Sequence, residues 1–149
     1  MFYVRKNFND LKFSTLYASY ELSKISENLK EEKAKIRQIL TDINKHLDNV
    51  KLFLKNEQFD CATTHCKLIV ECSREALSDA RRVVDKVTEI ESNLQFEGRS
   101  SAKNAKNLSE ELMYVACCAK ELLDELQSAA WRSNKTTCVK FVVCGFLFL

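Results

Sequence analysis

The chain has 149 residues and a net charge of +2, with 46% hydrophobic and 30% charged residues. This composition excludes an intrinsically disordered chain, and the near-neutral charge argues against a dedicated nucleic-acid binder. The sequence has no proline and only two glycines, so it lacks the turn residues of β-sandwiches and the glycine loops that bind nucleotides. We therefore expect one all-α domain built from long helices.

The chain begins with an aromatic N-terminal segment over residues 1–10, and Asn9 or Asp10 can cap the helix that follows. Aromatic residues continue into the start of that helix. They are Phe2, Tyr3, Phe8, Phe13, Tyr17 and Tyr20. These side chains either pack over one end of a helical bundle or form a surface for a membrane interface or a partner, and the sequence leaves both open.

Apolar residues recur at alternating steps of three and four in three segments, which is the pattern of helices that pack as coiled coils. We call each set a seam. The first seam contains Leu22, Ile25, Leu29, Ile36, Ile39, Ile43, Val50 and Phe53, the second Phe59, Ala62, Cys66, Ile69, Ala76, Ala80, Val83, Val87, Ile90 and Leu94, and the third Ala105, Leu108, Leu112, Val115, Ala119, Leu122, Leu126 and Ala129. Glu32, His46 and Ser73 are polar residues at seam positions.

The seams predict a coiled-coil-like bundle of three helices over residues 11–132. The helices are expected at 11–55, 57–97 and 101–132. Asn56, which tolerates a left-handed turn, lies where the first seam loses its phase, and Gly98 marks the second break. Short connections favour antiparallel neighbours, so we expect up-down-up order. The alternative is one or two continuous rods that dimerise along the same seams.

A short apolar C-terminal segment, residues 136–149, follows an aromatic and basic stretch, an arrangement typical of the point where a chain enters a membrane. The predicted membrane-anchor residues are Trp131, Arg132, Lys135, Phe141, Val142, Val143, Phe146, Leu147, Phe148 and Leu149. Because basic residues lie on the near side, the helical domain is expected to face the cytosol. As a helix the segment would reach about 21 Å, which is short of the ~30 Å hydrocarbon core.

Three interpretations of the segment remain open. It is a membrane-proximal, truncated transmembrane segment, an anchor that enters one leaflet, or apolar core that folds back on the bundle. Next to a membrane, Cys138 and Cys144 are candidates for S-acylation, and otherwise they are ordinary apolar cysteines.

The sequence predicts no catalytic, cofactor or metal site. One cluster carries zinc-ligand chemistry, namely Cys61, His65, Cys66 and Cys72, with His46 expected opposite Cys66 across the hairpin. It has no CxxC pair and its side chains point in several directions, so we interpret these residues as packed side chains. The odd number of cysteines, seven, and the lack of a signal-peptide pattern favour a reducing compartment.

We therefore predict a non-enzymatic, membrane-associated coiled-coil protein that acts as a spacer or protein-protein interaction module. Its C-terminal apolar segment would hold it at the bilayer. The expected partners are membrane lipid and other helical proteins or a second copy, and no nucleic acid. The alternatives are a soluble adaptor or assembly subunit whose apolar tail packs on a partner, and a membrane-perturbing helical protein.

Overall fold

The computed structural model describes the backbone of residues 2–93 and 99–147, and the side chains of residues 2–90 and 101–133. The described chain forms four α-helices, α1 (Phe2–Ser23), α2 (Lys30–Lys55), α3 (Phe59–Asn93) and α4 (Arg99–Leu147), with a short 3-10 helix, η1 (Glu27–Leu29), before α2. The described residues contain no strand, so the all-α prediction is confirmed. The predicted number of helices, three, is wrong.

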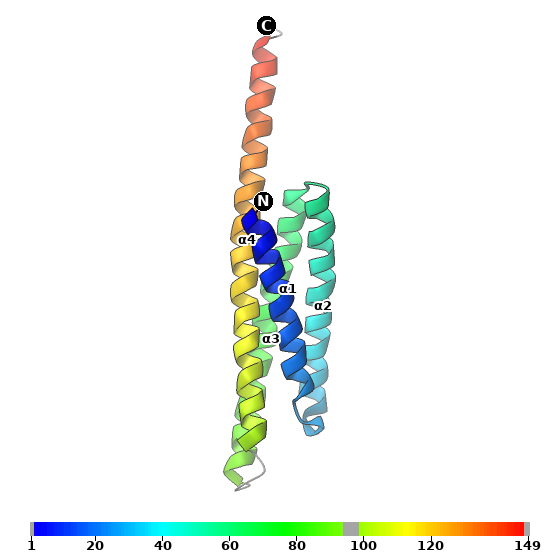
Figure 1. Cartoon of the computed structure of the whole chain (residues 1–149), viewed down its shortest axis with the longest axis vertical. Coiled ribbons are helices and arrows are strands. Elements are labelled where there is room, and N and C mark those ends of the chain that lie inside the picture. The colour runs from blue at the N-terminus through cyan, green and yellow to red at the C-terminus, as the bar shows by residue number, and fades with distance from the viewer. Residues whose placement is uncertain (1, 94–98, 148–149) are drawn as a thin grey trace.

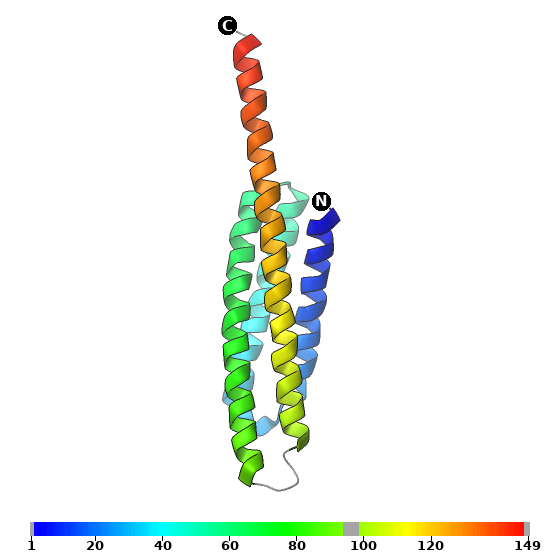
Figure 2. The same cartoon turned by 90° about the vertical axis from the view of Figure 1, so that its left-hand side faces the viewer.

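Consecutive helices run antiparallel and form one elongated bundle (Figure 1). α1 packs mainly against α4, α4 also packs against α3, and α3 packs against α2, whereas α1 and α2 touch less. The N-terminus and the α2–α3 turn lie at the same end of the bundle. From that end α4 continues alone, with no other helix beside it (Figures 1 and 2).

The predicted helix over residues 11–55 is in fact two helices, α1 and α2, that fold back on each other. Residues 2–10 do not form a separate segment, because α1 begins at Phe2 rather than at a cap on Asn9 or Asp10. Val4 and Phe8 from this stretch are buried in the core.

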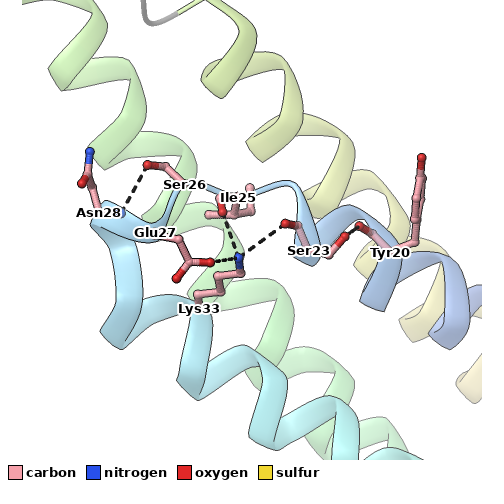
Figure 3. A network of polar contacts seen from close by, with 7 residues as sticks. All are labelled: Tyr20, Ser23, Ile25, Ser26, Glu27, Asn28 and Lys33. Carbon is pink, nitrogen blue, oxygen red and sulfur yellow. Dashed lines mark hydrogen bonds and ion pairs between the residues drawn. The ribbon is translucent and has the colours of Figure 1, made fainter.

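The chain reverses around the buried side chain of Lys33, which is only 5% exposed (Figure 3). Its ammonium group donates hydrogen bonds to the backbone oxygens of Ile25 at 3.0 Å and Ser23 at 3.4 Å, and to Oε1 of Glu27 at 2.7 Å. Carbonyls just past a helix end lack intrahelical partners, so Lys33 satisfies acceptors that the break in the helix leaves open. The hydrogen bond and the charge of Lys33 also lower the pKa of Glu27.

Ser26 supplies the restart signal. Its Oγ accepts a hydrogen bond from the backbone N–H of Asn28 at 3.2 Å and so caps η1. Leu22, Ile25 and Leu29 keep the heptad spacing across this break, and all three side chains are buried at the reversal. A straight helix over residues 11–55 would extend past the 35-residue α3, whereas the reversal allows α1 to bury an apolar face against α4.

The predicted turn between the first two seams is confirmed at residues 56–58. The N–H of Gln58 donates to the carbonyl of Phe53 at 2.8 Å, and the N–H of Glu57 donates to that of Leu54 at 3.2 Å. This pair of bonds is a Schellman motif. The left-handed residue is Glu57, with φ of 57°, and not Asn56, whose φ is −94°. Gly98, the predicted second break, lies outside the described residues.

The seams predict the core well. Every member of the third seam is buried, and Ile90 is the one described member of the second seam that lies exposed. Leu94 lies outside the described residues. Ser73 is also buried, and its hydroxyl is satisfied there because it donates a hydrogen bond to the carbonyl of Val70 at 2.8 Å. The predicted end of the last helix at 132 is wrong, because α4 runs without interruption to Leu147.

Replacing Lys33 with methionine keeps most of the buried aliphatic volume but leaves the carbonyls of Ser23 and Ile25 without their donor. We expect the free energy of unfolding to fall by about 1–3 kcal/mol, the usual cost of unsatisfied buried acceptors. Urea unfolding followed by circular dichroism measures it. Lys45→Met, at an exposed position of α2, is the matched control and should change stability by no more than about 0.5 kcal/mol. Equal stability of the two variants would show that Lys33 does not hold the reversal.

Candidate functional site

The structure describes the side chains of two of the predicted membrane-anchor residues. Trp131, which is 63% exposed, and Arg132 lie between Ala130 and Ser133 of α4, two residues that line a depression with the α2–α3 turn at the end of the bundle. For eight further candidates the structure describes the backbone and not the side chain, namely Lys135, Cys138, Phe141, Val142, Val143, Cys144, Phe146 and Leu147. Phe148 and Leu149 lie outside the described residues altogether. What the structure shows is the helical backbone through Leu147, beyond the bundle (Figure 2).

In the part of the chain that the structure describes, no helix combines the length and the apolar character needed to cross a membrane. The transmembrane interpretation of the C-terminal segment is therefore not supported.

The fold brings the N-terminus to the same end as the predicted anchor. Ser14 Oγ of α1 lies 3.7 Å from Cys118 Sγ of α4. Because α1 and α4 run antiparallel, this contact places the first turn of α1 level with residues 127–130 of α4. Ala130 and Ser133 also line a shallow depression with the α2–α3 turn. Sequence reasoning missed this association of distant segments.

One face of α1 is apolar and open to solvent. We call it the outer face of α1, and it consists of Phe2, Phe13, Leu16, Tyr17 and Tyr20, which are 58% to 72% exposed. Residues 13, 16, 17 and 20 follow helical spacing, and Phe2 precedes Phe13 by eleven residues, or three turns, so all share one side. The opposite side of the helix is buried through Val4, Phe8, Leu11, Thr15, Ala18 and Leu22. Of the six N-terminal aromatic residues, only Phe8 packs in the core.

Basic residues lie in and beside the outer face of α1. Arg5 and Lys12 are exposed along one edge of it, and Lys6 is exposed within it, between Phe2 and Phe13. Lys24 lies 4.3 Å from the ring centre of Tyr20 and forms an ion pair with Glu21 at 3.4 Å. On α2, Arg37 lines a shallow depression with Ser19 and Ser23 of α1. The surface therefore combines aromatic rings with positive charge on the flanks.

The two histidines of the chain contact each other across α2 and α3. Nδ1 of His46 lies 3.1 Å from Nδ1 of His65, whose ring stacks on Phe53. Such a hydrogen bond needs one protonated and one unprotonated nitrogen, so it is lost when both rings are cationic. Burial and the neighbouring His65 lower the pKa of His46, with Asp42 acting in the opposite direction.

The potential zinc ligands are not brought together. His46 faces His65 rather than Cys66, and the Sγ of Cys66 donates to the carbonyl of Ala119 at 3.5 Å. Burial, helped by the charge of Asp124, raises the pKa of Cys66 to about 12, while Cys61 is exposed. Among the residues described, no three His, Cys, Asp or Glu side chains are placed to hold a metal ion.

α2 and α3 also share two charged contacts. Asp79 is buried, with Oδ1 lying 3.4 Å from Lys35 and 3.5 Å from Arg82, while its Oδ2 has no hydrogen-bond partner. Glu32, a polar residue of the first seam, pairs with Lys86, and this hydrogen bond lowers the pKa of Glu32. We assign both contacts to helix packing, because they join neighbouring helices and leave no enclosed site.

Sequence reasoning missed Lys33 and Asp79, although their spacing carried a signal. Lys33 follows Leu29 by four residues and precedes Ile36 by three, and Asp79 follows Ala76 by three. These steps place both charges on the same side of their helix as seam residues, where a charge requires a partner.

Comparison with known proteins does not assign the chain to a family. No protein-family model matches the chain, and neither a curated protein nor a solved structure matches it significantly. The fold therefore defines the class, an all-helical bundle protein, and the functional argument depends on the surfaces described above.

The histidine pair predicts a stability that depends on pH. The folded state resists protonation of His46, whereas the unfolded state takes up the proton near the ordinary pKa of about 6.5. The free energy of unfolding should therefore fall as the pH drops from about 7.5 to about 5.5. Urea unfolding at intermediate pH values measures the slope. His46→Gln should flatten it, and an unchanged slope in that variant would contradict the assignment.

The burial of the cysteines predicts a clear order of thiol reactivity. Cys61 and Cys117 are exposed, so they should react with iodoacetamide in the native protein. Cys66, which is buried and has a raised pKa, should react at least tenfold more slowly until the chain is unfolded. Site-resolved mass spectrometry separates the sites. Labelling of Cys66 as fast as Cys61 under native conditions would show that α3 and α4 do not enclose it.

Proposed function

We propose that this chain is a non-enzymatic helical interaction module held at a membrane by the C-terminal end of α4. One observation carries the proposal. The last turns of α4 project past the bundle, and no other helix lies beside them (Figure 1). The sequence of the projection is apolar from Phe141 to Leu147. Because this part of α4 lies beyond the bundle, the other helices offer these residues no surface against which to bury. Lipid offers that burial at about 25 cal/mol per Å².

The chemistry at the base of the projection supports the same proposal. Trp131 and Arg132 are exposed where α4 leaves the bundle, and Lys135 follows in the sequence. Aromatic and basic side chains are favoured at the membrane–water interface, where rings sit at headgroup level and cations meet anionic lipid. The basic flank favours a bundle that faces the cytosol. Acylation of Cys138 or Cys144 would add a second membrane signal.

The non-enzymatic part of the proposal is supported by the histidine pair. The chain has two histidines, and they contact each other rather than a nucleophile. A nucleophile, a base and an orienting group within hydrogen-bond reach are what covalent catalysis needs.

A second candidate function is supported by the outer face of α1. A soluble adaptor would use exposed aromatic residues such as Tyr17 and Tyr20 to bind another helical protein or a second copy, and its apolar tail would pack on that partner. The two functions differ in whether the tail meets lipid or protein.

Flotation of the full chain with vesicles of phosphatidylcholine and phosphatidylserine tests the membrane proposal. The variant Phe141→Ser with Phe146→Ser should bind at least tenfold more weakly, because two large apolar side chains no longer enter lipid. Thr136→Ser with Thr137→Ser is the matched control in the same projection and should bind like the natural chain. If all three proteins stay unbound, the adaptor is favoured, and release of a trapped dye would favour membrane perturbation.

A further inference from the structure

We infer that the outer face of α1 is a second membrane contact, so that the bundle lies with α1 along an anionic lipid surface. The inference rests on the proposed function, since it takes the same bilayer as partner, but it concerns a different surface of the molecule. It assigns a role to the most exposed apolar helix face that the structure describes.

The first argument is the size and position of this face. Phe13, Leu16 and Tyr17 are each more than half exposed, although they lie in the middle of a 22-residue helix rather than at a frayed end. Together with Phe2 and Tyr20 they follow α1 for most of its length, about 30 Å at 1.5 Å per residue. The exposed Lys6 and Asn9 separate Phe2 from the apolar cluster of Phe13, Leu16, Tyr17 and Tyr20. An exposed apolar cluster of this kind on a water-soluble surface marks a binding surface.

The second argument is charge. Arg5 and Lys12 are exposed along one edge of the face, Lys6 lies within it, and Asp10, on the other edge, is the one exposed acidic residue of α1. Glu21 does not offset them, because it is paired with Lys24. Helices with aromatic and aliphatic residues on one side and lysine or arginine on its flanks lie in the plane of a membrane interface and prefer anionic lipid.

The third argument is geometry. α1 packs along α4, and the two helices run side by side over the length of α1 (Figure 2). A surface that contacts α1 along its axis therefore also runs along the direction in which α4 projects. A bilayer that contacts α1 along its length therefore lies parallel to the projecting end of α4, and contacts at both places would bind more tightly than either alone.

Charge favours lipid over a second copy as the occupant. Arg5, Lys6 and Lys12 give this side of α1 an excess of positive charge over the single exposed acid Asp10, which a second copy would carry as well. Phosphatidylserine headgroups instead supply the complementary charge.

Vesicle binding of the full chain tests the inference. Leu16→Ser with Tyr20→Ser should weaken binding to vesicles with 30% phosphatidylserine at least tenfold. Leu68→Ser with Ile90→Ser removes two exposed apolar residues from α3, which does not adjoin α1, and should change binding less than about twofold. Lys6→Gln with Lys12→Gln should weaken binding to these vesicles while leaving the weaker binding to pure phosphatidylcholine unchanged. Circular dichroism verifies that each variant keeps its helices.

A fluorescence readout reports which face meets the lipid. The chain has one tryptophan, Trp131, so Trp131→Phe gives a silent background. Adding Tyr17→Trp should give an emission that shifts to the blue on anionic vesicles and is quenched by brominated lipid. Adding Leu68→Trp instead, on α3, should give neither effect.

The outcomes separate the two proposals. If Phe141→Ser with Phe146→Ser weakens binding but Leu16→Ser with Tyr20→Ser matches its control, the inference is wrong and the α4 anchor stands. If the reverse holds, the α1 contact stands and the α4 anchor fails. A chain that dimerises without vesicles, and becomes monomeric on Leu16→Ser with Tyr20→Ser, would make this face a self-association interface and overturn the inference.

Discussion

The ammonium group of Lys33 holds the chain reversal on which the arrangement of the helices depends. It satisfies the backbone oxygens of Ser23 and Ile25, which the end of α1 leaves without partners, and it pairs with Glu27. Burying a charge is costly unless it is fully hydrogen-bonded, so this side chain favours the reversed connection over a continuous helix. Through that reversal α1 reaches α4.

The pairing of α1 with α4 determines which surfaces the molecule presents. It buries Val4 and Leu11 and leaves the outer face of α1 in solvent. It also sets the N-terminus beside the point where α4 leaves the bundle (Figure 1). The outer face of α1 and the projecting end of α4 thereby lie along one direction of the molecule. The contacts between α2 and α3, including the histidine pair, have a different role, because they align two helices.

Much of the core was predictable from spacing alone. Ile36, Leu112 and Leu122 are buried as their seams predict, because a repeat of three and four places residues on one side of any helix. The turn at Asn56 was predictable because the seam loses phase there. The reversal at Ser26 was not, since the heptad phase continues through Leu22, Ile25 and Leu29, and no glycine or proline marks the break. The expectation that His46 lies opposite Cys66 was wrong, because equal distance from a turn does not determine which way a side chain points.

The sequence by itself determined that the chain is helical, which residues form most of the core in α2, α3 and α4, and that an apolar stretch follows Trp131. These properties are local, since they depend on composition and on the periodicity of one helix. Only the tertiary structure decided that there are four helices, that α4 projects past the others, and that the aromatic residues of α1 mostly face solvent. Those properties depend on which helix packs against which, and that choice is made by partners far apart in the chain, such as Ser14 with Cys118 and His46 with His65.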